Sequence, residues 1–150
     1  MQIFEQDIKY FDIISKLNKE EILVQSKLPN KALDYINLQF FNNWVVVFTT
    51  AEGSFFIKVN NDGCFQLKQR IHLELFEAFK LVFDTNRKIG TEKSLFNQFS
   101  VSSKKDIQTV INFFSFSGLH PLTGLKGIQY FNWLNNLRNS QRYNNLNFPK

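Results

Sequence analysis

The sequence contains few of the residues that cross-link, break or kink secondary structure. Its 150 residues include one cysteine, three prolines and six glycines. The single Cys64 excludes an intrachain disulfide and a metal site built from several cysteines. No apolar run approaches the ~18–20 residues that a membrane-spanning helix needs, so we expect no membrane partner. The amino-terminal residues also lack the apolar core of a secretory signal and the arginine-rich character of a transit peptide.

Phenylalanine is the residue in excess, and a modest positive charge accompanies it. The chain has 18 phenylalanines and a formal net charge of +5. Asn, Lys and Ile are also frequent. Because AT-rich codons specify all of these residues, we expect an organellar gene whose product is made where it works, such as a mitochondrion. The charge suits an anionic partner and fits an ordinary solvated surface equally well. The length fits one domain with a sizeable core.

The residue pattern divides the chain into two regions, and only the second contains candidate functional residues. In residues 1–43, apolar side chains at helical spacing predict a helix over 4–17 and a shorter one over 31–40. We interpret this region as a helical extension or linker, and it carries no residue with an evident chemical role. Residues 44–150 form the main predicted domain, which contains all the candidate functional residues.

Alternating side chains and turn residues divide the main domain into elements. Strands are predicted at 54–59 and 64–70 around an Asn-Asn-Asp-Gly turn, and at 95–102 within a second hairpin. Helical spacing predicts helices over about 73–83, 104–114 and 128–139. Gly53 is expected to end the segment before the first strand in a left-handed conformation. The predicted fold class is therefore α+β.

Residues 44–56 support two conflicting interpretations. Local propensity predicts a buried strand, because the run is β-branched and aromatic: Trp44-Val45-Val46-Val47-Phe48-Thr49-Thr50. Together with the Ala51-Glu52-Gly53-Ser54-Phe55-Phe56 that follows, the same run resembles the signature of the LAGLIDADG homing endonucleases. That signature often reads W-hydrophobic-x-G-F-T-(D/S)-(A/G)-E-G-(S/C)-F and forms an interface helix.

A second cluster near the carboxyl end carries the same resemblance. The family's P-L-x-G-x-K-x-x-Q segment is matched by residues 121–129, and its S-x-R-Y ending by residues 140–143. The resemblance covers about 44–146, and it implies a helix over 45–51 and the element order αββαββα. One motif per chain implies assembly with a second LAGLIDADG unit, most simply as a homodimer. The implied dimer interface consists of Val46, Val47 and Thr50.

The resemblance assigns roles to three side chains. Glu52 is implied to be catalytic and to bind Mg²⁺, a hard cation that prefers oxygen ligands. Gln69 is implied to orient water, and Lys126 to stabilise charge at the scissile phosphate. In two departures from the signature, Val47 replaces glycine and Thr50 replaces a frequent aspartate. The valine should widen the helix crossing, since overpacking a tight contact costs ~1–3 kcal/mol, and a wider crossing would weaken metal sharing between paired Glu52 side chains.

The predicted strands supply a candidate nucleic-acid surface. Alternation places Phe55, Ile57 and Val59 on a core face. The opposite face is mostly polar or basic, and a β-ribbon of this kind can contact base edges and phosphates. An ordinary solvated sheet face has the same pattern. The candidate binding residues are Phe56, Lys58, Asn60, Gln66, Lys68, Arg70, Gln98 and Ser100.

Two functions are compatible with these features. One is an intron-encoded, Mg²⁺-dependent DNA homing endonuclease that acts as a dimer. The other is a cleavage-deficient RNA-binding descendant without a cofactor. It would be an intron maturase or a structural component of a mitochondrial ribosome, with ribosomal RNA and ribosomal proteins as partners. Val47 favours the second function. Either way the chain binds nucleic acid in a mitochondrion or another organelle, and the sequence leaves enzymatic activity undecided.

Overall fold

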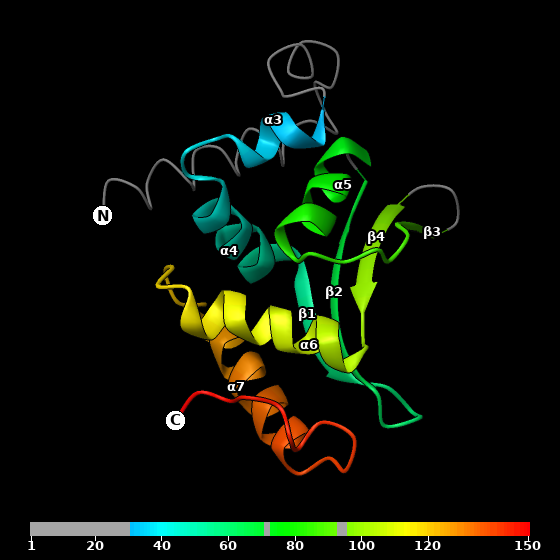
Figure 1. Ribbon diagram of the computed structural model, residues 1–150, viewed down its shortest axis with the longest axis vertical. Coiled ribbons are helices and arrows are strands. Elements are labelled where there is room, and N and C mark those ends of the chain that lie inside the picture. Colours follow the sequence, from blue (N-terminus) through cyan, green and yellow to red (C-terminus); the bar gives the residue numbers. More distant parts are fainter. Residues whose placement is uncertain (1–30, 71–72, 93–95) are drawn as a thin grey trace.

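The described residues form one antiparallel sheet with helices packed against it (Figure 1). A computed structural model describes residues 31–70, 73–92 and 96–150, so the helix predicted over 4–17 lies outside the described residues. The predicted order αββαββα is confirmed from α4 to α6, and α7 follows it. The elements are α3 (Ala32–Ile36), α4 (Phe41–Glu52), β1 (Gly53–Ile57), β2 (Gly63–Gln69), α5 (Leu73–Val82), β3 (Gly90–Glu92), β4 (Phe96–Val101), α6 (Lys104–Ile111), the π-helical turn η1 (Asn112–Phe116) and α7 (Gly124–Arg138).

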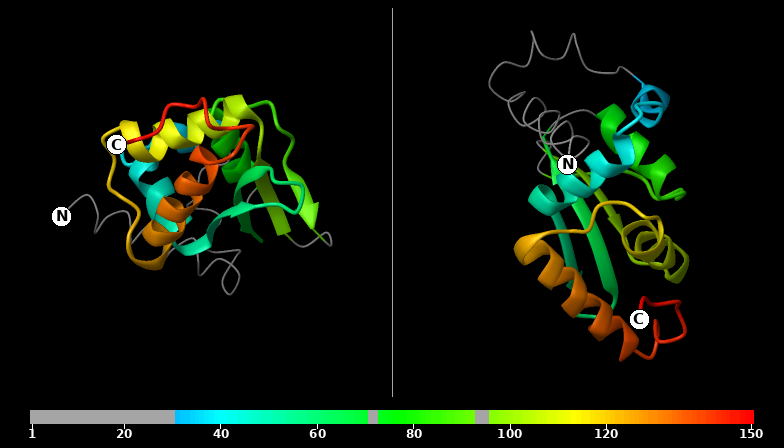
Figure 2. Two further views of the ribbon diagram at one scale, coloured as in Figure 1. Left: turned by 90° about the horizontal axis from the view of Figure 1, so that it is seen from below. Right: turned by 90° about the vertical axis from the view of Figure 1, so that its left-hand side faces the viewer.

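The four strands pair in the order β1-β2-β4-β3, and all neighbours are antiparallel. The central strands β2 and β4 place Gln66 opposite Ser100 and Lys68 opposite Gln98. Helices α4, α5 and α6 pack against one face of the sheet, and α7 lies along the edge strand β1 (Figure 1 and Figure 2). We call the other face, which carries these four paired side chains, the open face.

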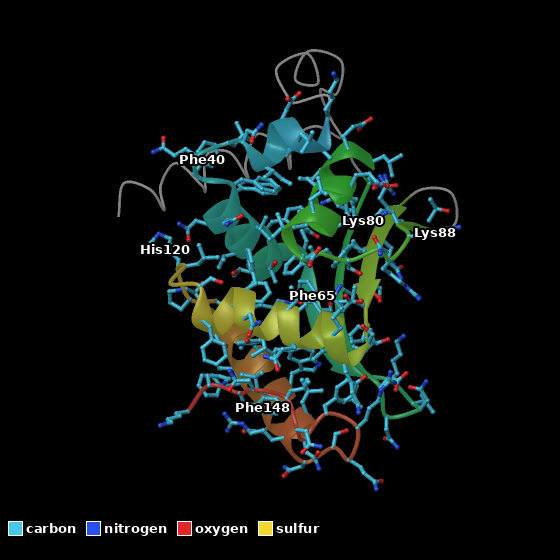
Figure 3. The ribbon with its side chains drawn as sticks, in the orientation of Figure 1. Phe40, Phe65, Lys80, Lys88, His120 and Phe148 are labelled. Carbon is cyan, nitrogen blue, oxygen red and sulfur yellow. The ribbon has the colours of Figure 1, made fainter. Side chains whose placement is uncertain are left out.

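Phenylalanine rings fill the space between the sheet and its helices. Phe65 lies at the centre (Figure 3), and its ring centroid is 5.1 Å from that of Phe55, 5.4 Å from that of Phe83 and 5.5 Å from that of Phe114. Offset and edge-on aromatic pairs contribute ~0.5–1.5 kcal/mol beyond the area that they bury. The excess of phenylalanine in the sequence is therefore largely a property of the core.

Helix α4 forms against its local propensity. The helix implied by the LAGLIDADG resemblance is confirmed, and the strand predicted from β-branched residues is wrong. One side of α4 is buried, including Trp44, Val45 and Phe48, and the Trp44 ring lies 5.2 Å from that of Phe48. A β-branched residue costs a helix only a few tenths of a kcal/mol, whereas burying a large apolar side chain stabilises by ~1.5–3 kcal/mol. Tertiary packing therefore outweighs propensity.

Strand β1 and helix α7 are among the elements whose boundaries differ from the sequence prediction. Strand β1 ends at Ile57, because the chain turns back where the Lys58 N–H donates to the Asp62 carbonyl at 2.8 Å. Val59 consequently lies in the turn and is fully exposed, so its predicted core position is wrong. Helix α7 begins at Gly124, four residues before the predicted start at 128. Two glycines in its first turn lower helix propensity and hid that start.

The amino-terminal part of the described chain packs on the main unit. Helix α3 contacts α5, and α4 begins at Phe41, three residues before the signature tryptophan. Residues from Ala32 onward therefore share the folded unit that carries the sheet. In the described ranges, no helix has the length and apolar character required to cross a membrane.

The buried hydroxyl of Thr49 gives a test of this packing. Its Oγ1 has no hydrogen-bond partner among the described residues, whereas the neighbouring Thr50 Oγ1 donates to the Val46 carbonyl at 2.9 Å. An unsatisfied buried polar group costs about 1–3 kcal/mol. We expect Thr49→Val to raise the free energy of unfolding by about 1 kcal/mol in urea titrations. Thr50→Val is the matched control, and a gain at Thr50 equal to that at Thr49 would contradict the assignment.

Candidate nucleic-acid-binding site

The open face of the sheet carries a continuous row of polar and basic side chains. In β2, Phe65 and Leu67 are buried, while Gln66 and Lys68 are half-buried and Arg70, just after the strand, is exposed. The predicted alternation of this strand is therefore confirmed. Opposite these residues, β4 contributes half-buried Gln98 and Ser100. The structure thus brings together five of the eight predicted binding residues.

Phe96 joins this row, although the sequence analysis missed it. The Lys68 Nζ and the Arg70 Cζ each lie 5.2 Å from the centroid of the Phe96 ring. Such cation–π contacts hold flexible basic side chains over the ring. The signal was present in the sequence, because Phe96 precedes Gln98 by two residues and so shares its face of β4. The basic end of the open face is therefore partly organised before any partner binds.

The other three predicted residues lie toward the opposite end of the hairpin. Phe56 is half-buried on β1, and its carbonyl accepts a hydrogen bond from Trp133 Nε1 at 3.2 Å. Lys58 and Asn60 belong to the turn and not to a strand, and the Asn60 Nδ2 donates to Asp62 Oδ2 at 3.2 Å. Lys58 and the Lys68–Arg70 pair therefore sit at opposite ends of the sheet face.

The length of this face sets the size of a partner that it can contact. Strand β2 has seven residues. At ~3.3 Å per residue this is roughly 20 Å, which equals the axial rise of about six base pairs of duplex. Positive side chains lie at both ends of this face, and hydrogen-bonding amides lie between them. This arrangement matches a partner whose edges are charged and whose interior presents hydrogen-bonding groups.

Glu52 and Lys126 lie near enough to interact electrostatically where α4 ends and β1 begins. Glu52 is the last residue of α4 and is half-buried. Burial raises the pKa of its carboxyl, and the Lys126 ammonium acts in the opposite direction. Burial likewise lowers the pKa of Lys126, while Glu52 raises it. We call the group formed by Glu52, Gly53 and Lys126 the corner.

Three side chains of α7 bind the backbone of β1. The Lys126 Nζ donates to the Gly53 carbonyl and, at 3.3 Å, to Gln129 Oε1. The same Gln129 oxygen accepts a hydrogen bond from the Phe55 N–H at 3.1 Å, and Trp133 Nε1 donates to the Phe56 carbonyl. Their spacing of three and four residues places all three on one side of the helix. Lys126 thus binds a carbonyl of its own chain, and its implied role at a phosphate stays a prediction.

Gln69 lies at the same end of the sheet as the corner. Gly53 pairs with Leu67 across the first hairpin, so Gln69 extends two residues past the start of β1. Its Oε1 accepts a hydrogen bond from the Arg70 N–H at 2.7 Å. The position agrees with a residue near Glu52, and its implied role in orienting water stays a prediction.

A single chain does not offer a complete magnesium site at the corner. Mg²⁺ needs about six oxygen ligands in near-octahedral geometry, usually including one or two carboxylates. Among the described residues, no group of three or more His, Cys, Asp or Glu side chains could hold a metal ion. The Gly53 carbonyl, which follows Glu52, already accepts a hydrogen bond from the Lys126 ammonium. The donor set of one chain therefore does not fit a resident Mg²⁺, and a site shared between two chains stays a prediction.

The outer side of α4 differs in part from the predicted dimer interface. Val46 is only 1% exposed and faces the core, so its assignment to the interface is wrong. Val47 and Thr50 are half-buried, and Ala51 is exposed beside them. Asn43, one turn before Val47, accepts the His120 N–H at 3.0 Å and ties α4 to the loop before α7. The open stripe of α4 therefore consists of Asn43, Val47, Thr50 and Ala51.

Comparison with solved structures identifies the fold. I-GzeII in complex with its DNA target is 31% identical over 67% of this chain and 36% of its own, with a TM-score of 0.52. I-LtrWI bound to target DNA is 20% identical, covering 73% of this chain and 41% of its own, with a TM-score of 0.54. I-TnaI is 16% identical over 61% of this chain and 67% of its own, with a TM-score of 0.52. All three are homing endonucleases. This chain has the LAGLIDADG homing-endonuclease fold.

A curated relative comes from yeast mitochondria. The chain is 25% identical over 158 aligned positions to the uncharacterized mitochondrial protein RF1 of Saccharomyces cerevisiae. The match covers 92% of this chain and 31% of that protein, so the chain spans less than a third of its relative. No family model matches the sequence. The LAGLIDADG resemblance drawn from residues 44–56 and 121–143 is thus confirmed at the level of the fold.

In this LAGLIDADG fold, Gly53 is required by a close contact. Its φ of −85° and ψ of 163° are extended, so the predicted left-handed conformation is wrong. A Cβ at this position would lie 2.6 Å from Thr49 Cγ2 and 2.7 Å from the Thr49 carbonyl oxygen. The glycine therefore allows β1 to start directly beneath the last turn of α4, which places Glu52 at the edge of the sheet.

Alanine at Gly53 tests this contact. We expect Gly53→Ala to lower the free energy of unfolding by ~1–3 kcal/mol, the usual cost of overpacking, when measured by urea titration. Gly90→Ala is the matched control, because the atom nearest to its new Cβ is the Gln98 carbonyl oxygen at 3.8 Å. That control should change stability by less than about 0.5 kcal/mol. Equal losses at the two glycines would contradict the steric account.

Proposed function

We propose that this chain is a nucleic-acid-binding protein that holds duplex DNA against the open face of its sheet. The observation that carries the proposal is the row of Gln66, Lys68 and Arg70 facing Gln98 and Ser100, on the side of the sheet turned away from α4, α5 and α6. The I-GzeII structure, which is in complex with a DNA target, supports the choice of DNA.

The side chains on this face suit the two parts of a duplex. Lysine and arginine neutralise phosphates and release bound counterions, which makes affinity depend on salt. Glutamine amides can pair with adenine, and Lys68 or Arg70 with guanine, when strands enter a major groove about 12 Å wide. Phosphate contacts would set the register of the protein on the duplex, and the amides would read the bases between them.

We further propose that two LAGLIDADG units act together, most simply as a homodimer. The aligned parts of I-GzeII and I-LtrWI are 36% and 41% of their chains, so each of those chains has room for a second unit. The stripe of α4 defined by Asn43, Val47, Thr50 and Ala51 supplies small and polar side chains on which a second α4 can pack. The yeast mitochondrial relative supports an organellar location.

Metal-dependent cleavage of the bound DNA is the second candidate function. The observation that favours it is the electrostatic interaction of Glu52 with Lys126 at the corner, where the LAGLIDADG resemblance implies both residues. Two such corners, one from each unit, would provide the two carboxylates that a metal pair needs. Cleavage requires this assembly, whereas binding by the open face does not.

Removal of three positive charges tests the proposed binding. We expect the Lys58→Ala, Lys68→Ala, Arg70→Ala triple variant to lose at least about tenfold in affinity for a random-sequence DNA duplex. The slope of log affinity against log salt should flatten by about 0.9 for each phosphate contact that is lost. Fluorescence anisotropy over a salt series measures both quantities. An RNA duplex of the same length, measured in parallel, tests the alternative of an RNA-binding descendant.

The matched control removes the same charge from other elements. Lys31, Lys104 and Lys105 are exposed, and they lie at the start of α3 and in α6. Their triple alanine variant should bind DNA with nearly the wild-type affinity and salt slope. Equal weakening by the two triple variants would show that only net charge matters, and this outcome would overturn the assignment of the open face. Tighter binding to RNA than to DNA would shift the proposal to the RNA-binding function.

A further inference from the structure

Two charges at the corner are placed where their own helices disfavour them. Glu52 is at the carboxyl end of α4, which carries a partial negative charge, and Lys126 is in the first turn of α7, which carries a partial positive charge. Burial also acts against the charged form of each side chain. Each group therefore needs a compensating partner, and each provides opposite charge to the other.

Hydrogen bonds fix the ammonium at this position. The Lys126 Nζ donates to the Gly53 carbonyl and to Gln129 Oε1. Gln129 is itself held, because the same oxygen accepts the Phe55 N–H at 3.1 Å. The ammonium is consequently fixed on the carbonyl of the residue that follows Glu52, from where it interacts electrostatically with the Glu52 carboxylate.

We propose that Lys126 is a built-in cation for the corner, which supplies the positive charge near Glu52 that a divalent metal would otherwise bring. A metal ion that approached Glu52 in the free chain would meet the positive charge of Lys126 and would have to displace it from the Gly53 carbonyl. Like charges repel strongly where water is partly excluded, and Mg²⁺ gives up its water shell reluctantly. The free chain therefore binds no Mg²⁺ at Glu52.

A metal titration without nucleic acid tests this inference independently of the proposed DNA binding. The probe is Mn²⁺, whose free concentration is read by electron paramagnetic resonance. We expect no Glu52-dependent binding by the wild-type chain. Lys126→Met, which keeps the length of the side chain and removes its charge, should bind Mn²⁺ at least about tenfold more tightly. Adding Glu52→Gln to this variant should abolish the gain, because the carboxylate that holds the metal is removed.

Two control variants separate the charge of Lys126 from other effects. Lys126→Arg keeps a cation and should resemble wild type, as should Lys104→Met, which removes an exposed lysine from α6. Lys126→Gln keeps a donor for the Gly53 carbonyl and should gain Mn²⁺ binding, so it serves if circular dichroism shows that Lys126→Met is unfolded. Glu52-dependent Mn²⁺ binding by wild type would overturn the proposal. Folded methionine and glutamine variants without a gain would overturn it as well.

Discussion

The free edge of β1 carries backbone groups that a neighbouring strand would otherwise bind, and side chains of α7 bind them instead. Lys126 and Gln129 reach Gly53 and Phe55, and Trp133 reaches the next carbonyl. An unpaired edge invites strand addition by another chain, and its buried polar groups would be costly without partners. Helix α7 removes both problems and fixes the start of β1 directly after Glu52. Because α7 lies along the edge of the sheet, the open face stays available to a partner.

The fold could be predicted from the sequence where local pattern and tertiary packing agree. Alternation located β2 and β4, because one side of each strand is buried and the other is not. The residues of α4 favour a strand locally, and only the resemblance predicted a helix there, since its stability comes from packing around Trp44 and Phe48. The end of β1 was missed because a left-handed Asn61 and the hydrogen bonds of its turn decide it.

The candidate site could likewise be predicted only in part from the sequence. The motif pattern pointed to Glu52 and Lys126, and the structure brings them to one corner. Spacing in the sequence could not show that Lys126 binds a backbone carbonyl, because that contact joins residues 73 positions apart. Phe96 followed the alternation of β4 but was not predicted as a binding residue, because its side chain has no polar group. Val46 was misassigned because only the packed helix reveals which side of α4 faces the core.

The central claim is that nucleic acid lies on the open face of the sheet, across β2 and β4. Photocrosslinking of the wild-type chain to a DNA duplex that contains 5-iodouracil tests it most directly, since this base reacts with aromatic side chains in contact with it. After proteolysis and mass spectrometry, the account predicts crosslinks at Phe96 and Phe56, whose rings lie on or beside that face. Crosslinks confined to exposed aromatic side chains elsewhere, such as Phe116 or Phe131, would contradict the account.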